Sequence, residues 1–386
     1  MFKQLIRACL IVGVFWSNSV CAQSSYPLWK NLEPGPYQVG FKTIDYIDKS
    51  RSIPGGLSDN RFFPIQISIW YPTTDQWSID KALPFEHYFF KTAQKNDFNE
   101  LSEQQKAQAM DIFFNYAKYG LSIEFTADEK QEIGSKPTAA MANVREAPGP
   151  FPVLLAGHDG GVWKMSTLCE YLASHGYAVI STGPLSGSNR LFRQNTQQVI
   201  NRRIRTFEIV RGLLDDFPNI DQSQIGLLGL NSDGISTLLY QMKNLTADAM
   251  VSVDGWEGKN NGFSYASSSV YYEPANLKIP RMEFQQHESP ENESLYVNTT
   301  IFDSLTQIDR FSFIMKDFGH AYLTGNLFVL PQLDETINQK HYFWYESVKG
   351  FFDAYLKEDK NALIELRTNR NESDGFFMRN QRLYKK

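Results

Sequence analysis

Cysteine is scarce in this chain of 386 residues, which contains only Cys9, Cys21 and Cys169. The first two lie in the N-terminal segment discussed below, so the rest of the chain has one cysteine and cannot form an intramolecular disulfide. Cys169 lies at helical spacing with Leu168 and Leu172, which favours a core residue over a nucleophile. The fold must therefore be held together by burial of side chains alone.

An excess of positive charge is also lacking, since the formal net charge is −5. This net charge argues against a basic surface that binds the phosphates of a nucleic acid, so we expect no nucleic-acid partner. The chain is 42% hydrophobic and 21% charged, which is an ordinary globular mixture and argues against disorder. Its length suits one α/β domain with insertions.

The apolar run near the N-terminus, "ACLIVGVFW" at 8–16, is too short to span a bilayer. The basic residues Lys3 and Arg7 precede this run. The small residues Val20 and Ala22 occupy the two positions before the cleavage site at which a signal peptidase requires small side chains. We interpret residues 1–22 as an export signal, with an uncleaved membrane anchor as the alternative. The protein is then expected to be secreted or periplasmic, with no transmembrane segment after cleavage.

Short apolar runs alternate with amphipathic segments from residue 151 onward, and this alternation predicts a mainly parallel sheet. An antiparallel strand is expected earlier, over 63–72, where apolar and polar residues alternate. Strands that alternate with helices imply right-handed crossovers and helices on both faces of the sheet. The predicted strands are 151–157, 177–182, 225–230, 249–254, 281–286 and 310–316, and the predicted helices are 167–176, 197–217, 236–245 and 345–359.

The segment 85–147 does not fit this alternation, because its patterns are helical. Ser102 and Thr126 are expected to be helix N-caps, and Glu129 completes a capping box with Thr126. We interpret the segment as a helical cap inserted over the carboxyl edge of the sheet. A peripheral packing element is the alternative.

Polar residues follow several predicted strands at their carboxyl ends, where ligands bind in open α/β sheets. A turn after a strand, then an acid, then a histidine is the chain order of the α/β-hydrolase triad. A hydroxyl needs an imidazole to take its proton, and the imidazole needs a carboxylate to orient it and stabilise its charge. The candidate residues are Asp159, Asn231, Ser232, Asp254 and His320.

The sequence "PVLLAGHDGG…LCEYLASHGYAVIS…IDQSQIGLLGLNSDG…VSVDGWEG…FGHAYLTG" resembles the platelet-activating-factor acetylhydrolase and dienelactone-hydrolase-like branch of the α/β hydrolases. The resemblance covers about residues 150–325 and a C-terminal helix. It implies an α/β-hydrolase domain over 23–366, with a mostly parallel sheet of about eight strands, followed by a polar tail over 367–386. It also implies a serine ester hydrolase acting on small or short-acyl esters, without a metal or another cofactor.

The resemblance also implies site roles for individual residues. Asp254 takes the place of the triad acid and His320 that of the base. The backbone N–H groups of Asp159 and Ser232 take the places of the two oxyanion-hole donors.

The turn "GLNSDG" departs from the pattern G-x-S-x-G-G of this family. Without a gap, Asn231 falls on the nucleophile position, and the interval from Asn231 to Asp254 matches the spacing that the family shows. An asparagine amide is no nucleophile of this type. Asp233 replaces a glycine, and Asp159 brings a carboxylate to the loop that should stabilise an oxyanion.

Three interpretations remain open for this turn. Ser232 is the nucleophile after a shift of one residue, which gives a catalytic set of Ser232, Asp254 and His320. In the second interpretation, the site is inactive and the fold binds a ligand. In the third, the residues only form a helix N-terminus, which suits Asn, Ser and Asp.

We therefore hold two functional hypotheses. The first is an ester hydrolase of the serine type. The second is an inactive hydrolase-fold protein that binds a small ligand under its cap. In both cases the expected partner is a small ester or lipid-like molecule, and the oligomeric state is left open.

Overall fold

The computed structural model describes residues 26–53, 62–94, 96–184, 196–287, 297–367 and 377–383, and every structural statement below concerns these residues. The predicted export signal over 1–22 lies outside them. Within these ranges, no helix has the length and apolar character needed to cross a bilayer.

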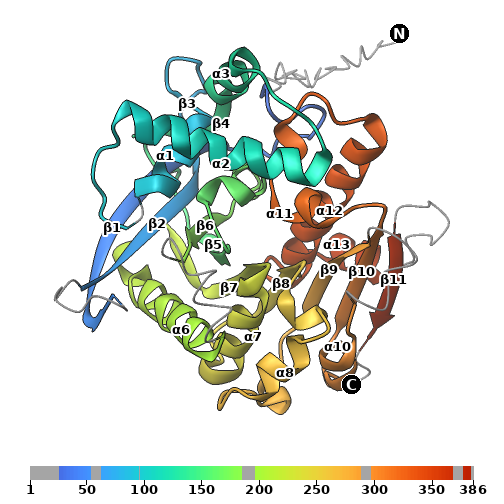
Figure 1. Ribbon diagram of the computed structural model, residues 1–386. Helices are drawn as coiled ribbons and strands as arrows, with labels where there is room; N and C mark the ends of the chain where they lie inside the picture. The colour runs from blue at the N-terminus through green and yellow to red at the C-terminus, as the bar shows by residue number, and fades with distance from the viewer. Residues whose placement is uncertain are drawn as a thin grey trace, which may run out of the picture.

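One large twisted sheet runs through the described part of the chain (Figure 1). It contains eleven strands in the order β11-β10-β9-β8-β7-β5-β6-β2-β1-β4-β3, so the expectation of about eight strands is wrong. The strands are β1 (Gln38–Ser52), β2 (Phe62–Thr73), β3 (Ala82–Pro84), β4 (Pro137–Ala142), β5 (Phe151–Gly157), β6 (Ala178–Thr182), β7 (Ile220–Leu230), β8 (Ala249–Val253), β9 (Arg281–His287), β10 (Arg310–Lys316) and β11 (Phe377–Arg382).

The predicted parallel core of the sheet is confirmed. Strands β6, β5, β7, β8, β9 and β10 are neighbours in that order, and each pairs in parallel with the next. The additional strands lie at the two edges. Strand β2 pairs antiparallel with β6 and with β1, β4 joins β1 in parallel, and β3 pairs antiparallel with β4. Strand β11, from the segment predicted as a polar tail, pairs antiparallel with β10.

Helices lie on both faces of the sheet, as the alternating pattern predicted (Figure 1). Buried side chains form one hydrophobic cluster that includes residues of α4 and α12, and another that includes residues of α6 and α7. The helices are α1 (Glu86–Gln94), α2 (Glu103–Leu121), α3 (Ala127–Ser135), α4 (Ser166–Ser174), α6 (Thr196–Gly212), α7 (Ser232–Asn244), α8 (Gly262–Ser267), α10 (Thr300–Ser304), α11 (His320–Thr324), α12 (Glu335–Tyr355) and α13 (Lys360–Arg367).

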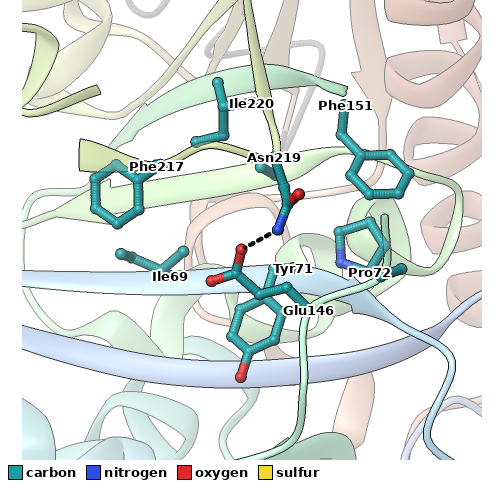
Figure 2. Close-up of a pocket in the computed structure, with 10 residues that line it drawn as sticks. Ile69, Tyr71, Pro72, Glu146, Phe151, Phe217, Asn219 and Ile220 are labelled. Atoms are coloured by element: carbon teal, nitrogen blue, oxygen red, sulfur yellow. Dashed lines mark hydrogen bonds between the residues drawn. The ribbon is translucent and has the colours of Figure 1, made fainter. Parts of the chain in front are cut away.

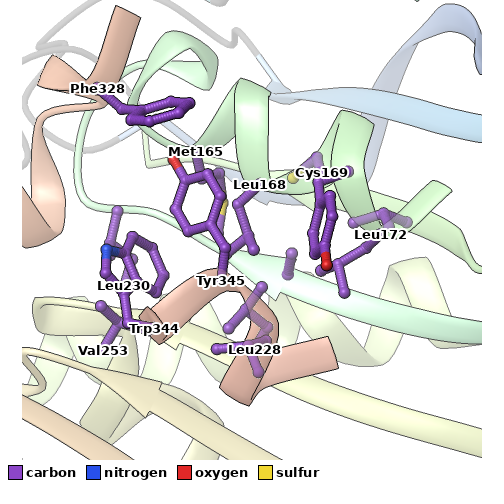
Figure 3. Close-up of a cluster of buried hydrophobic side chains, with 14 of the residues drawn as sticks. Met165, Leu168, Cys169, Leu172, Leu228, Leu230, Val253, Phe328, Trp344 and Tyr345 are labelled. Carbon is purple, nitrogen blue, oxygen red and sulfur yellow. The ribbon is translucent and has the colours of Figure 1, made fainter. Parts of the chain in front are cut away.

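Strands β5 and β8 are buried along their whole length, because neighbouring strands and both helical layers cover them. Figure 3 shows the packing on the α12 face, where Trp344 and Tyr345 meet side chains of α4 and of strands β7 and β8. Cys169 lies inside this cluster and is fully buried, which confirms its interpretation as a core residue. Burial also raises the pKa of the Cys169 thiol well above its ordinary value, which disfavours the thiolate form that a nucleophile requires.

The segment 85–147 forms helices α1, α2 and α3, and then strand β4. Its last part is therefore a strand within the sheet, in place of the continuous helical block that the sequence predicted. Both predicted N-caps are confirmed, since Ser102 and Thr126 each accept a bond from the backbone N–H three residues on, within a capping box.

Glu170 of α4 joins this segment to the rest of the fold. Its buried carboxylate accepts hydrogen bonds from Trp29 Nε1 (3.0 Å), Tyr88 Oη of α1 (2.7 Å) and the backbone N–H of Ala139 in β4 (3.3 Å). Burial raises the pKa of Glu170 from its ordinary 4.5 to about 7, although these three hydrogen bonds act in the opposite direction. One titratable group therefore ties four segments of the chain together.

Because its folded-state pKa is raised, Glu170 stabilises the fold most below pH 4.5 and loses this contribution as the pH rises through about 7. We expect Glu170→Gln, which resembles the protonated carboxyl, to remove about 3 kcal/mol of pH-dependent stability over this window. Urea unfolding of both proteins at a series of pH values measures the difference.

Glu103→Gln is the matched control, because that side chain is 90% exposed at the start of α2. It should leave the pH dependence of unfolding unchanged. If the curves of wild type and Glu170→Gln run parallel from pH 4.5 to 7, the assignment of this titration to Glu170 is wrong.

Candidate functional site

The candidate residues lie at the carboxyl ends of neighbouring parallel strands. Asp159 follows β5, Asn231 follows β7, Asp254 follows β8, and His320 begins α11 after β10. In the sheet β5, β7 and β8 are adjacent, and only β9 separates β8 from β10. The topology therefore brings four segments, which are far apart in the sequence, to one edge of the sheet.

Asn231 lies at the apex of a sharp turn between β7 and α7. Its backbone has φ 55° and ψ −120°, a conformation that L-residues adopt rarely and asparagine tolerates better than most. The side chain is buried, and Nδ2 donates a hydrogen bond to Asp159 Oδ2. Among the described residues, Asn231 Oδ1 is buried without a hydrogen-bond partner.

Backbone hydrogen bonds hold the register of this turn. The N–H of Asn231 donates to Val253 O (3.0 Å), and Asn231 O accepts from the N–H groups of Gly234 (3.0 Å) and Trp256 (3.1 Å). Ser232 lies one residue later and is the first residue of α7. The strained apex therefore carries Asn231, and a shift that placed Ser232 there would break these bonds.

Two glycines allow the turn to pack closely. A Cβ on Gly229 would lie 2.6 Å from Asp233 O, and one on Gly234 would lie 2.8 Å from the Cα of Gly255. Asp233 is accommodated in this tightly packed turn because its carboxylate pairs with Arg203 of α6 at 2.8 and 2.9 Å. Burial raises the pKa of Asp233, and the Arg203 guanidinium opposes this shift.

Asp254 and His320 are in contact. His320 Nδ1 hydrogen bonds to Asp254 Oδ2, and Lys259 Nζ donates to the same oxygen at 2.9 Å. Asp254 is fully buried, whereas the His320 side chain is 32% exposed. Burial raises the pKa of Asp254, but Lys259 and then His320 outweigh burial, so that the pKa lies below its ordinary range. The carboxylate is therefore charged and can orient the imidazole.

Asp159 forms a further buried charged pair, with Lys164 of the short helix η1 (Val162–Met165). Lys164 Nζ lies 2.9 Å from Asp159 Oδ1, and both side chains are at most 9% exposed. Burial raises the pKa of Asp159, but the Lys164 ammonium outweighs it, so the pKa is lowered. Burial lowers the pKa of Lys164, but the negative charge of Asp159 outweighs burial, so the pKa of Lys164 is raised. Both groups are charged at neutral pH.

Helix α2 contacts both parts of this site. The Lys164 ammonium lies 4.7 Å from the centroid of the Tyr116 ring, and Tyr116 Oη lies 2.6 Å from Thr324 Oγ1. Thr324 Oγ1 in turn donates to the carbonyl oxygen of His320 at 2.8 Å. Gly120 of α2 also approaches Ala321 closely. The second helix of the inserted segment therefore packs on the helix that carries His320.

The structure brings together four of the predicted residues as two contacts, Asn231 with Asp159 and Asp254 with His320. Sequence reasoning missed the cationic partners of this site, because each lies on a loop or helix whose position the chain pattern does not reveal. Lys164 and Lys259 each follow their carboxylate by five residues, a spacing that predicts no contact in a helix or in a strand. The missed residues are Tyr116, Lys164, Arg203 and Lys259.

Within the described residues, no group of three or more His, Cys, Asp or Glu side chains is placed to hold a metal ion. Figure 2 shows a mainly apolar pocket at the opposite end of the strands, where Phe151 begins β5 and Ile220 begins β7. Its polar contact joins Asn219 Nδ2 to Glu146 Oε2 at 2.9 Å. This pocket is remote from the carboxyl ends of the strands and contains none of the candidate residues.

Comparison with solved structures gives a match to "Ferulic acid esterase from Streptomyces cinnamoneus" with a TM-score of 0.60. The two chains are 18% identical, and the match covers 89% of this chain and 96% of the esterase. No family model matches the sequence, and a search of curated proteins gives no match. The chain therefore has the α/β-hydrolase fold of this esterase, while the predicted branch within that fold has no support from the comparisons.

The ion pair of Asp159 with Lys164 allows a test of whether the buried charge of Asp159 depends on its partner cation. We expect Lys164→Met to destabilise the protein by about 3–5 kcal/mol, because it leaves a buried carboxylate without its cation. The double variant Lys164→Met/Asp159→Asn should recover most of this loss, because it leaves no isolated charge. Urea unfolding at neutral pH measures both effects.

Lys106→Met is the control, since Lys106 pairs with Glu103 on the exposed surface of α2 and its loss should change stability little. Equal destabilisation of the single and double variants would show that burial of the Asp159 charge does not cause the loss.

Proposed function

We propose that this chain is a hydrolase-fold protein that binds a small ester or lipid-like ligand and forms no acyl-enzyme at its strand turn. The observation that carries the proposal is Asn231 at the apex of the turn, with its amide hydrogen-bonded to Asp159. An amide nitrogen shares its lone pair with the carbonyl group, so it cannot attack an ester as a hydroxyl does.

The charge of Asp159 supports the same proposal. In an ester hydrolase, donors at this loop stabilise the oxyanion of the tetrahedral intermediate, and each donor contributes about 3–4 kcal/mol. A charged, buried carboxylate beside the apex opposes a developing negative charge. The change at Asn231 and the change at Asp159 thus act against one reaction step, and they are in direct contact.

The proposed ligand class follows from the fold and from the retained pair of Asp254 and His320. The solved structure with the similar fold is named an esterase, which supports an ester-type ligand for this chain. In this proposal the inserted helices act as a cap on the site, because α2 packs on η1 and α11. The predicted signal over 1–22 would take the protein to the periplasm or outside the cell.

A second candidate is an ester hydrolase in which Ser232 attacks. One observation favours it: Asp254 and His320 form the contact that a general base requires, and the acid is charged. Lys259 binds the same carboxylate oxygen as His320, so it offsets part of the negative charge that would stabilise an imidazolium.

A fluorophosphonate probe tests the main proposal, because it labels an activated serine whatever the substrate. We expect no labelling of the wild type and none of Asn231→Ser, whose hydroxyl would still lie beside the Asp159 carboxylate. The triple variant Asn231→Ser/Asp159→Gly/Lys164→Met should be labelled at position 231, because it removes the charged pair together with the amide.

Adding His320→Ala to the triple variant should abolish its labelling, and circular dichroism should confirm that each variant is folded. Labelling of the wild type on Ser232 would overturn the proposal. A folded triple variant that resists the probe would show that Asn231 and Asp159 are not what prevents acyl-enzyme formation.

Turnover of a short-acyl aryl ester tests the second candidate. If Ser232 attacks, Ser232→Ala abolishes turnover, whereas the matched control Ser236→Ala, one turn later in α7, retains it. Under the main proposal, the wild type, Ser232→Ala and Ser236→Ala should all show no more turnover than the His320→Ala protein. If hydrolysis is lost in His320→Ala but kept in Ser232→Ala, Ser232 is not the nucleophile.

A further inference from the structure

The backbone of Asn231 has a second chemical consequence. In an L-residue, Cβ is rotated about 120° from the backbone nitrogen around the Cα–C bond. The ψ of −120° at Asn231 therefore places Cβ in eclipse with the nitrogen of Ser232. Rotation about the Cα–Cβ bond is then the only torsion that must change for Cγ to approach the Ser232 nitrogen. The backbone therefore already has the geometry that a five-membered ring requires.

We propose that Asn231 is a modification site, at which the folded protein promotes loss of the side-chain amide through a succinimide formed with Ser232. The proposal rests on the geometry of the turn and is independent of whether the site binds or hydrolyses esters. Its product is an aspartate or isoaspartate at the apex of the turn.

The reaction balances with water as its only co-reactant. The Ser232 nitrogen attacks Asn231 Cγ, its proton passes to the departing nitrogen, the Cγ–Nδ2 bond breaks, and ammonia leaves. Water then opens the ring at one of its two carbonyl carbons, which gives aspartate or isoaspartate. Neither step requires an oxidant, a reductant or a metal.

The surroundings of Asn231 suit this reaction. Asp159 accepts a hydrogen bond from Nδ2, so a carboxylate lies next to the nitrogen that must acquire a proton and leave. Among the described residues, no hydrogen bond holds Oδ1, so the carbonyl can turn as Cγ approaches Ser232. The hydrogen bonds of Asn231 N and O hold the backbone in the reactive conformation, which lowers the entropy cost of ring closure.

Two other asparagines show what the turn contributes. Asn326 is buried and also has a positive φ of 49°, but its ψ of 33° rotates Cβ away from the next nitrogen. Asn261 precedes Gly262, the small residue that least hinders ring closure in a flexible chain, but its ψ is −2° in the folded protein. Folding should therefore accelerate the reaction at Asn231 and slow it at Asn261.

The experiment incubates the purified protein at mildly alkaline pH, folded and unfolded in urea, and follows each asparagine by peptide mass spectrometry. We expect the folded protein to modify Asn231 at least about tenfold faster than the unfolded chain does, because the turn holds the near-attack geometry. Asn261 should react more slowly in the folded protein than in the unfolded chain, and Asn326 should stay unmodified in the folded protein.

Two variants check the route. Asn231→Gln should show no mass gain at this position, because its longer side chain cannot form the same ring. Ser232→Val should slow the reaction, since a branched side chain hinders the attacking nitrogen. An Asn231 that reacts no faster in the folded protein than in urea would overturn the proposal, whatever the fluorophosphonate probe shows.

Discussion

The turn at Asn231 is the constraint on which the arrangement of the site depends. Its φ of 55° and ψ of −120° reverse the chain between β7 and α7, and hydrogen bonds to Val253 and Trp256 hold it against the end of β8. Because Asp254 directly follows the last residue of β8, the same hydrogen bonds position the acid that contacts His320. A residue with positive φ is costly, so the surrounding sheet and helices must stabilise it.

Buried charges surround this turn, and cations pair with them. Lys164 pairs with Asp159, Arg203 with Asp233, and Lys259 with Asp254. An isolated carboxylate in the interior is unfavourable by several kcal/mol, so each buried acidic residue near the turn requires a partner cation. Asp159 and Asp233 are therefore accommodated beside the turn as ion pairs, which keeps two negative charges next to the apex without an isolated buried charge.

Much of the fold could be predicted because buried parallel strands have a clear signature. The apolar runs at 151–157 and 249–254 have no alternation, and β5 and β8 are buried on both faces. Strands at or near the edges of the sheet carry weaker signals. Strand β4 follows three helices and reads as part of them, and β11 lies in a polar segment, so both were missed. These short strands depend on neighbouring strands for their hydrogen bonds, and the local sequence does not reveal those neighbours.

Sequence alone determined the chain order of the site, with Asn231, Asp254 and His320 each placed after a strand. This order follows from local periodicity, since a strand end can be located from its own residues. The sequence motif left open whether Asn231 or Ser232 occupies the apex of the turn. Only the tertiary structure decided it, because φ and ψ at the apex depend on hydrogen bonds from β8 and from Trp256. The cations of the site were likewise decided by packing, since Arg203 reaches Asp233 from α6 and the short helix η1 brings Lys164 back onto Asp159.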